Sequence, residues 1–101
     1  MIVLINVFEV EPGKEDTFFE VWKRVSAVME ARAGFIHTRL HRATAGARFV
    51  NVAEWESMEA FAAAINSPEF REAAAPLREL GQESPALFQV VYEAGRPPAH
   101  A

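Results

Sequence analysis

One strongly polar side chain, Asn6, lies inside the otherwise apolar run IVLINVFEV at residues 2–10. The run is rich in β-branched residues and is followed by the turn signal Pro12-Gly13, so it predicts a buried strand. A buried amide without a partner costs roughly 1–3 kcal/mol. Two interpretations stay open. Either Asn6 is satisfied by nearby backbone or water, or it points into a cavity and stabilises negative charge on a substrate oxygen.

Three basic side chains, His37, Arg39 and His41, alternate along residues 35–43 and therefore share one face of a predicted strand. The two histidines are roughly 13 Å apart on a strand, which is too far to chelate one ion, and no metal site is predicted. One interpretation is an exposed edge strand whose charges discourage pairing with another chain. The other places His37 as a general base, or Arg39 as an anion anchor, at the mouth of a pocket.

Large aromatic side chains are numerous enough to form the walls of a pocket for a flat apolar ligand. Trp22 lies on a predicted helix, Trp55 on a predicted strand and Phe61 on a second helix. Aromatic residues at such spacings equally suit the core of a small domain. If they fill the space beside Asn6, a binding or structural module is favoured. If they line a cavity there, a substrate site is favoured.

Composition excludes several classes of function. The 101 residues contain 10 Lys+Arg and 14 Asp+Glu, for a formal net charge of −4, and no cysteine. A mildly acidic chain without a basic stripe indicates no nucleic-acid interface and no polybasic membrane site. Without cysteine there is no disulfide, thiolate metal site or thiol nucleophile.

Cofactor and targeting signals are also missing from the sequence. No G-x-G-x-x-G, P-loop or nucleophile elbow is present, so no flavin, nicotinamide or nucleotide cofactor is predicted. The apolar run at the start of the sequence carries no basic residue and is already interrupted at Glu9. We therefore expect neither a signal peptide nor a membrane span. We therefore expect a cytoplasmic protein.

The elements that must position these side chains are predicted in the order β-α-β-β-α-β. Strands are expected over residues 2–10, 35–43, 48–56 and 86–93, and helices over 15–33 and 57–80, with a hairpin turn at 44–47 and a loop at 82–85. This order is the ferredoxin-like split βαβ arrangement, an α+β fold with a four-stranded antiparallel sheet. Residues 1–94 form one predicted domain, and 95–101 form a flexible C-terminal tail.

Several residues mark the ends of the helices. Gly34 stands where a C′ glycine would follow the first helix, and Ser57 can cap the second. Ser67-Pro68 should restart that helix, because serine suits the N-cap and proline the first helical position. We expect a kink at Pro76 and a stop at Gly81.

Both faces of the first predicted strand are apolar. Alternation puts Val3, Ile5 and Val7 on the face opposite Asn6. Two helices can cover only one face of the sheet, and an antiparallel sheet that is wet on its other face should show polar residues there. We therefore expect a second copy of the sheet to cover this face, in an obligate homodimer with a two-fold axis.

Several segments together resemble the antibiotic biosynthesis monooxygenase family over residues 2–94. They are LINVFEVEPG, GFIHTRLHR, RFVNVAEWES followed by EAFAAAINSPEF, and FQVVYE, of which AEWES with its following helix is the most specific. The resemblance implies a dimeric α+β barrel in which two four-stranded sheets face each other and the helices lie outside. It also implies an active-site asparagine at Asn6.

The resembled family includes cofactor-independent oxygenases of aromatic polyketides, quinol monooxygenases and haem-degrading enzymes, so likeness of fold cannot choose among them. Its haem-degrading members use a tryptophan and an iron-ligating histidine. The matching positions here hold Ala64 and either Ala73 or Ala74. An alanine cannot ligate iron, and haem degradation is therefore disfavoured.

The expected function is cofactor-independent monooxygenation of an electron-rich aromatic such as a quinol or an anthrone, with O₂ as the second substrate. Such a substrate ionises and hands an electron to O₂, while the protein excludes water and holds the anion. Asn6 would hold the anion and His37 is the candidate general base. The candidate substrate-binding residues are Trp22, Trp55, Phe61 and Arg39. The alternative is a non-catalytic small-molecule-binding or structural dimer module of the same fold.

Overall fold

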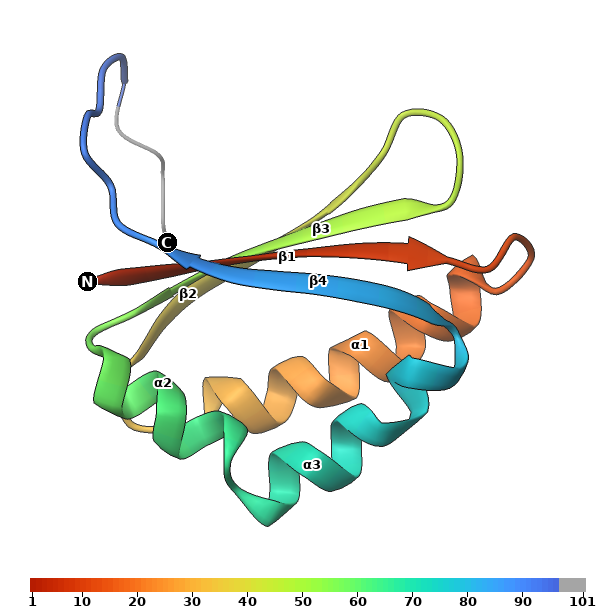
Figure 1. Ribbon diagram of the computed structural model, residues 1–101, viewed down its shortest axis with the longest axis horizontal. Helices are drawn as coiled ribbons and strands as arrows, with labels where there is room; N and C mark the ends of the chain where they lie inside the picture. The colour runs from red at the N-terminus through yellow and green to blue at the C-terminus, as the bar shows by residue number, and fades with distance from the viewer. Residues whose placement is uncertain (97–101) are drawn as a thin grey trace.

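The computed structural model describes residues 1–96 as a four-stranded antiparallel sheet with its helices on one face (Figure 1). The elements are β1 (Ile2–Val10), α1 (Glu15–Glu30), β2 (Phe35–Arg42), β3 (Arg48–Trp55), α2 (Met58–Ile65), α3 (Pro68–Ala74), the 3₁₀ helix η1 (Ala75–Glu79) and β4 (Gly81–Phe88). The strand order is β2-β3-β1-β4. The predicted ferredoxin-like α+β fold is confirmed.

The helix α1 presents one apolar face to the sheet, because Phe18, Val21, Val25 and Met29 recur at helical spacing and are buried. It ends at Glu30, three residues before the predicted 33. Gly34 follows in the turn into β2 with a φ of +88°, in the left-handed region that glycine favours. A Cβ at Gly34 would also overlap with the Cβ of Ala60, so the turn and the packing both require glycine.

Two serine residues cap the N-termini of α2 and α3 in the second helical segment, as predicted. The Ser57 Oγ accepts a hydrogen bond from Ala60 N at 3.1 Å, and the Ser67 Oγ accepts one from Phe70 N at 3.2 Å. Pro68 occupies the first turn of α3, where its missing N–H costs nothing. In place of the predicted kink at Pro76, the chain tightens from the α-helix into the 3₁₀ helix η1.

The last strand lies five residues earlier than the predicted 86–93. Residues 82–85, predicted as a loop, pair with β1, and Pro85 stands opposite Asn6. The prediction is wrong because β4 is an edge strand, where polar residues and proline are tolerated. Gly81 does not end a helix in the left-handed region. It stands opposite Val10 in β4, and a Cβ there would collide with the Glu9 carbonyl oxygen.

Beyond β4, residues 89–96 continue without regular structure. The apolar side chains of Val90, Val91 and Tyr92, predicted as part of a buried strand, are exposed in the single chain, Val91 by 94%. The predicted tail at 95–101 falls largely on residues 97–101, which lie outside the described residues. Within residues 1–96, no helix combines the length and the apolar character needed to cross a membrane.

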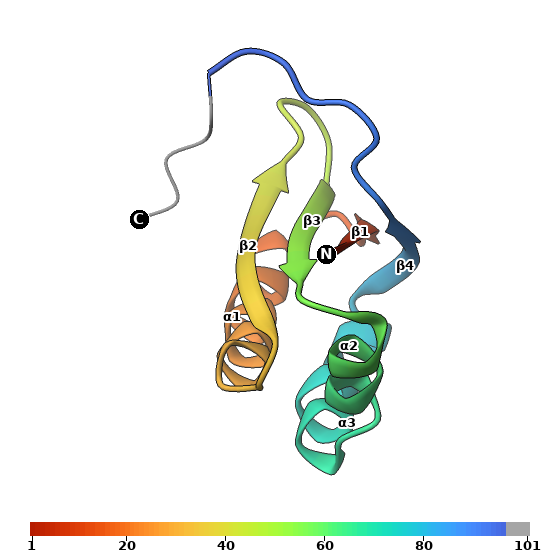
Figure 2. The same ribbon diagram turned by 90° about the vertical axis from the view of Figure 1, so that its left-hand side faces the viewer.

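Two aromatic clusters lie between the sheet and the helices. At one end, Phe18 contacts Phe8 and Phe49 with ring centroids 4.9 and 4.7 Å away. At the other end, the indole of Trp55 meets the rings of Phe35 and Phe61 edge-on, at 5.4 and 5.8 Å. The helix α1 and the α2–α3 pair lie side by side beneath the sheet (Figure 2). The space between the clusters faces the middle of the sheet.

The other face of the sheet carries no helix (Figure 1). Its centre is apolar, since Ile5 stands opposite Val52 and Val7 opposite Val50 in the β1–β3 register. This arrangement matches the alternation expected from the sequence. We call this surface, formed by the half-buried side chains of Ile5, Val7, Val50 and Val52, the open apolar face.

Candidate active site

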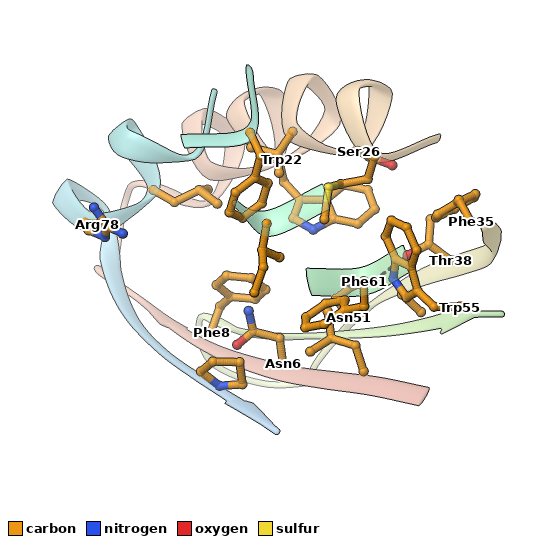
Figure 3. A pocket seen from close by; sticks show the side chains of 18 residues that line it. Asn6, Phe8, Trp22, Ser26, Phe35, Thr38, Asn51, Trp55, Phe61 and Arg78 are labelled. Carbon is orange, nitrogen blue, oxygen red and sulfur yellow. Dashed lines mark hydrogen bonds between the residues drawn. The ribbon is translucent and has the colours of Figure 1, made fainter. Parts of the chain in front are cut away.

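A cavity of about 310 Å³ lies between the sheet and the helices, midway between the two aromatic clusters (Figure 3). The sheet side includes Leu4, Asn6 and Asn51, and the helix side includes Trp22 and Phe70. Most of the lining is apolar or aromatic with a few polar groups, which is the usual composition of a small-molecule pocket. The large aromatic residues line this space and leave it open.

Asn6 forms part of the cavity wall on the most central part of β1. It is 9% exposed, and its Oδ1 is buried without a hydrogen-bond partner in the described structure. Its amide nitrogen points into the cavity (Figure 3). An unpaired buried polar atom costs roughly 1–3 kcal/mol, so the presence of one on Asn6 indicates a role for the amide in binding.

Asn51 is a second buried amide in the same wall, directly opposite Asn6 in the β1–β3 register. The Thr38 hydroxyl donates a hydrogen bond of 2.6 Å to the Asn51 Oδ1. The Asn51 nitrogen is then the end of the amide that can donate to a ligand. The sequence interpretation missed Asn51, although alternation in RFVNVAEW puts it on the same buried face as Trp55.

Trp55 supplies a further donor at one end of the cavity. The residue is 1% exposed, and its Nε1 is buried without a hydrogen-bond partner in the described structure. A buried indole N–H usually has an acceptor, so this unpaired donor is a candidate for binding a ligand. The structure therefore brings together four of the predicted site residues, Asn6, Trp22, Trp55 and Phe61.

Arg78, in η1, is the charged residue that lines the cavity. Its side chain is exposed to solvent and forms no salt bridge among residues 1–96. A guanidinium in that position can bind a carboxylate or an ionised oxygen of a ligand. Nothing in the sequence pattern distinguishes Arg78 from an ordinary solvated residue near the end of a helix.

The cavity does not include His37 or Arg39. In β2 the Cα partner of His37 is Glu54 and that of Arg39 is Val52. Both side chains therefore lie on the same side of the sheet as the open apolar face, away from the cavity. A register shift between Phe35 and His37 is the reason. This irregularity lets Phe35 line the cavity while the next odd-numbered residues turn away. The hypothesis that either residue lies at the pocket mouth is therefore corrected.

Metal and haem chemistry can be compared with the residues present. Among residues 1–96, no group of three or more His, Asp or Glu side chains could hold a metal ion. At the positions where the resembled haem enzymes hold a tryptophan and a histidine, Ala64 is fully buried and Ala73 and Ala74 are half-buried. None of the three side chains can ligate iron.

Comparison with known proteins agrees with this fold. Residues 1–76 match the family model described as antibiotic biosynthesis monooxygenase. The chain belongs to this family. The match covers β1 through α3 and therefore includes Asn6, Asn51 and Trp55.

Relatives within the family include characterised oxygenases. The chain is 32% identical over 88 residues to deoxynogalonate monooxygenase of Streptomyces nogalater, covering 86% of this chain and 74% of that protein. Among solved structures it is similar to SnoaB, a cofactor-independent oxygenase from Streptomyces nogalater, with a TM-score of 0.88 and 28% identity over 94% of this chain and 97% of that one. Rv0793 from Mycobacterium tuberculosis shares the fold, with a TM-score of 0.81 and 18% identity over 93% and 98%.

Proposed function

We propose that this protein is a cofactor-independent monooxygenase that oxidises an electron-rich hydroxylated aromatic, of the quinol or anthrone type, with O₂. The observation that carries the proposal is an apolar cavity of about 310 Å³ whose wall holds the buried amides of Asn6 and Asn51, with the Asn6 nitrogen pointing into it (Figure 3). The similarity to SnoaB, described as a cofactor-independent oxygenase, supports the same chemistry.

The reaction can proceed without a cofactor if the substrate supplies the electrons. An anthrone loses the proton of its central CH₂ group to give an enolate, which passes one electron to O₂. The resulting radical pair forms a C–O bond, and the hydroperoxide then loses water as the remaining C–H and the O–O bond break. The CH₂ group and O₂ become C=O and H₂O, so atoms and electrons balance.

We assign the N–H groups of the Asn6 and Asn51 amides to the enolate oxygen. The indole N–H of Trp55 is a further donor in a residue that lines the same cavity. Donors fixed in an apolar cavity stabilise developing negative charge far better than water does, because they need no reorganisation. The aromatic and aliphatic lining also keeps water away from the reactive intermediates.

Among residues 1–96, the cavity lining contains no His, Asp or Glu side chain. A substrate must therefore be acidic enough to ionise once the N–H donors hold its oxygen, with its proton passing to solvent. Hydroxylated anthrones and quinols satisfy this requirement, and unactivated hydrocarbons do not. His37 lies on the other face of the sheet and is not positioned to act as the general base of this cavity.

The same proposal includes a cytoplasmic homodimer. The open apolar face has no helix over it, and a second copy of the sheet would cover it. The side chains of His37 and Arg39 would then lie beside the interface between the two sheets. Their role in the protein would be in assembly, with no part in substrate binding.

Oxygen consumption by metal-free protein tests the function. The protein is treated with a chelator, and O₂ uptake is followed with an electrode across a panel of anthrones and hydroquinones. We expect uptake equal to the product formed, unchanged by the chelator. If several panel members bind in the cavity but none consumes O₂ above its background rate, the non-catalytic binding module is the correct function.

A further inference from the structure

The orientation of the Asn51 amide decides what this side chain offers to a ligand. One end of the amide only accepts hydrogen bonds and the other only donates them. A rotation of 180° about the Cβ–Cγ bond exchanges the two ends with almost no change in shape. The neighbouring hydrogen bonds must therefore determine which end faces the cavity.

Thr38 supplies that neighbouring bond. It stands opposite Ala53 in the β2–β3 register and is thus a diagonal neighbour of Asn51 on the same face of the sheet. Its Oγ1 lies 2.6 Å from the Asn51 Oδ1. Because an amide oxygen cannot donate, the hydrogen between the two oxygens belongs to the threonine hydroxyl.

The side chain of Thr38 is suited to holding this bond in one geometry. Two heavy atoms on its Cβ restrict its χ1 angle. The residue is half-buried at the edge of the cavity, in the wall shared with Asn51 and Ala53 (Figure 3). The bond engages the Asn51 oxygen and leaves the Asn51 nitrogen for the ligand.

The position of Asn6 explains why the orientation of the Asn51 amide matters for ligand binding. It stands opposite Asn51 across the β1–β3 pair, and its own nitrogen points into the cavity. Side chains directly opposite in an antiparallel pair have Cβ atoms only about 4.5–5.5 Å apart. Two amides at that spacing can both donate to one ligand oxygen, whereas an Asn51 with its oxygen turned inward would repel an anion.

We infer that Thr38 is a positioning residue: its hydroxyl fixes the Asn51 amide so that Asn51 and Asn6 together present N–H donors to the anionic oxygen of the substrate. The inference rests on the proposed function and extends it. The substrate oxygen at this point of the wall is an acceptor, either ionised or a carbonyl, and not a hydroxyl donor.

Removing the hydroxyl tests the inference. Thr38→Val keeps the branched shape and loses the donor, while Thr38→Ser keeps the donor and serves as the matched control. With an anthrone as substrate, we expect Thr38→Val to lower kcat by about three- to tenfold, the usual worth of one neutral hydrogen bond. KM should change by less than about twofold, and Thr38→Ser should stay near the wild-type rate.

Combining these changes with Asn51→Ala separates positioning from a structural role. If Thr38 acts through Asn51, then Thr38→Val should have no further effect on kcat in the Asn51→Ala background. A loss of the same size in both backgrounds would overturn the inference. An unchanged kcat in Thr38→Val with Asn51 intact would overturn it as well.

A bound indicator gives a readout that needs no turnover. 2-Hydroxyanthraquinone is already oxidised at its central ring, and its phenolate absorbs at a longer wavelength than its phenol. Wild type should lower the apparent pKa of the bound indicator, Thr38→Ser should preserve that shift, and Thr38→Val should reduce it. An equal shift in wild type and Thr38→Val would overturn the inference.

The two readouts also distinguish failure of the inference from failure of the proposed function. Wild-type protein that binds the indicator but oxidises no anthrone would contradict the proposed function alone, and the indicator titration would still decide the role of Thr38. Wild-type protein that does not bind the indicator would overturn both.

Discussion

Asn6 on β1 and Asn51 on β3 are directly paired across the sheet, and both side chains line the cavity between the sheet and the helices. The Asn51 oxygen accepts the Thr38 hydroxyl, while the Asn6 oxygen has no partner in the described structure. Two adjacent amides in a wall that is mostly apolar form a site for one negatively charged oxygen. This relationship explains why polar residues occupy the centre of a small sheet.

Asn6→Leu separates function from stability. The Asn6 oxygen has no hydrogen-bond partner within residues 1–96, so the change leaves no partner bare on that side, and leucine supplies a similar volume. We expect the variant to melt at or above wild type and to lose roughly 10²–10³ in turnover, the usual cost of one preorganised oxyanion donor. Thermal unfolding and steady-state kinetics measure the two effects. A clearly destabilised variant with full activity would mean that Asn6 is structural.

Arg78→Gln tests the charged end of the cavity. The guanidinium is exposed and lines the cavity, so it can meet an anionic substituent of the substrate while screened by water. We expect KM for an anthrone that carries a carboxylate to rise by roughly three- to tenfold, and less so at high salt. KM for the uncharged anthrone is the control and should stay constant. An equal change for both substrates would rule out charge recognition by Arg78.

Ile5→Lys tests the homodimer. Ile5 lies in the open apolar face, opposite Val52, so a lysine there would place charge in the proposed interface. Sedimentation should show a dimer for wild type and a monomer or unfolded chain for Ile5→Lys. The control Ala62→Lys adds the same charge at an exposed position of α2 and should remain dimeric. A folded, monodisperse wild-type monomer at micromolar concentration would contradict the dimer.

Haem should not be degraded stoichiometrically. Ala64, Ala73 and Ala74 offer no group that could ligate iron at the positions used by the haem-degrading enzymes that the sequence resembles. Haem is added with a reductant and catalase, and its main absorbance band is followed. We expect no ring-opened product, even if haem adheres to the aromatic surface. Loss of the band with such a product, despite the catalase, would show that the prediction is wrong.

Local sequence signals determined most of the fold. Three strands and both helical segments could be predicted from the apolar run of β1, the alternation in β2 and β3, the periodic face of α1 and the caps at Ser57 and Ser67. The position of β4 was not predictable in the same way. Its polar first half pairs because β1 offers an unpaired edge, and Pro85 is tolerated there because β4 has a free edge of its own.

The site was predictable only in part. Asn6 stood out because it interrupts an apolar run, and Trp22, Trp55 and Phe61 followed from their size and spacing. The roles of His37 and Arg39 depended on which face of β2 turned inward, and the irregularity beside Phe35 decides that. Arg78 reaches the cavity through tertiary packing of η1, for which the sequence carries no periodic signal.

The central claim is that one atom of O₂ is inserted into an aromatic substrate held in this cavity, and isotope labelling tests it most directly. Metal-free protein is supplied with an anthrone under ¹⁸O₂ in ordinary water, and the quinone product is analysed at once by mass spectrometry. The account predicts one ¹⁸O atom in each product molecule, with product formation strongly reduced in Asn6→Leu. Product without ¹⁸O, or labelled product formed equally fast by Asn6→Leu, would contradict it.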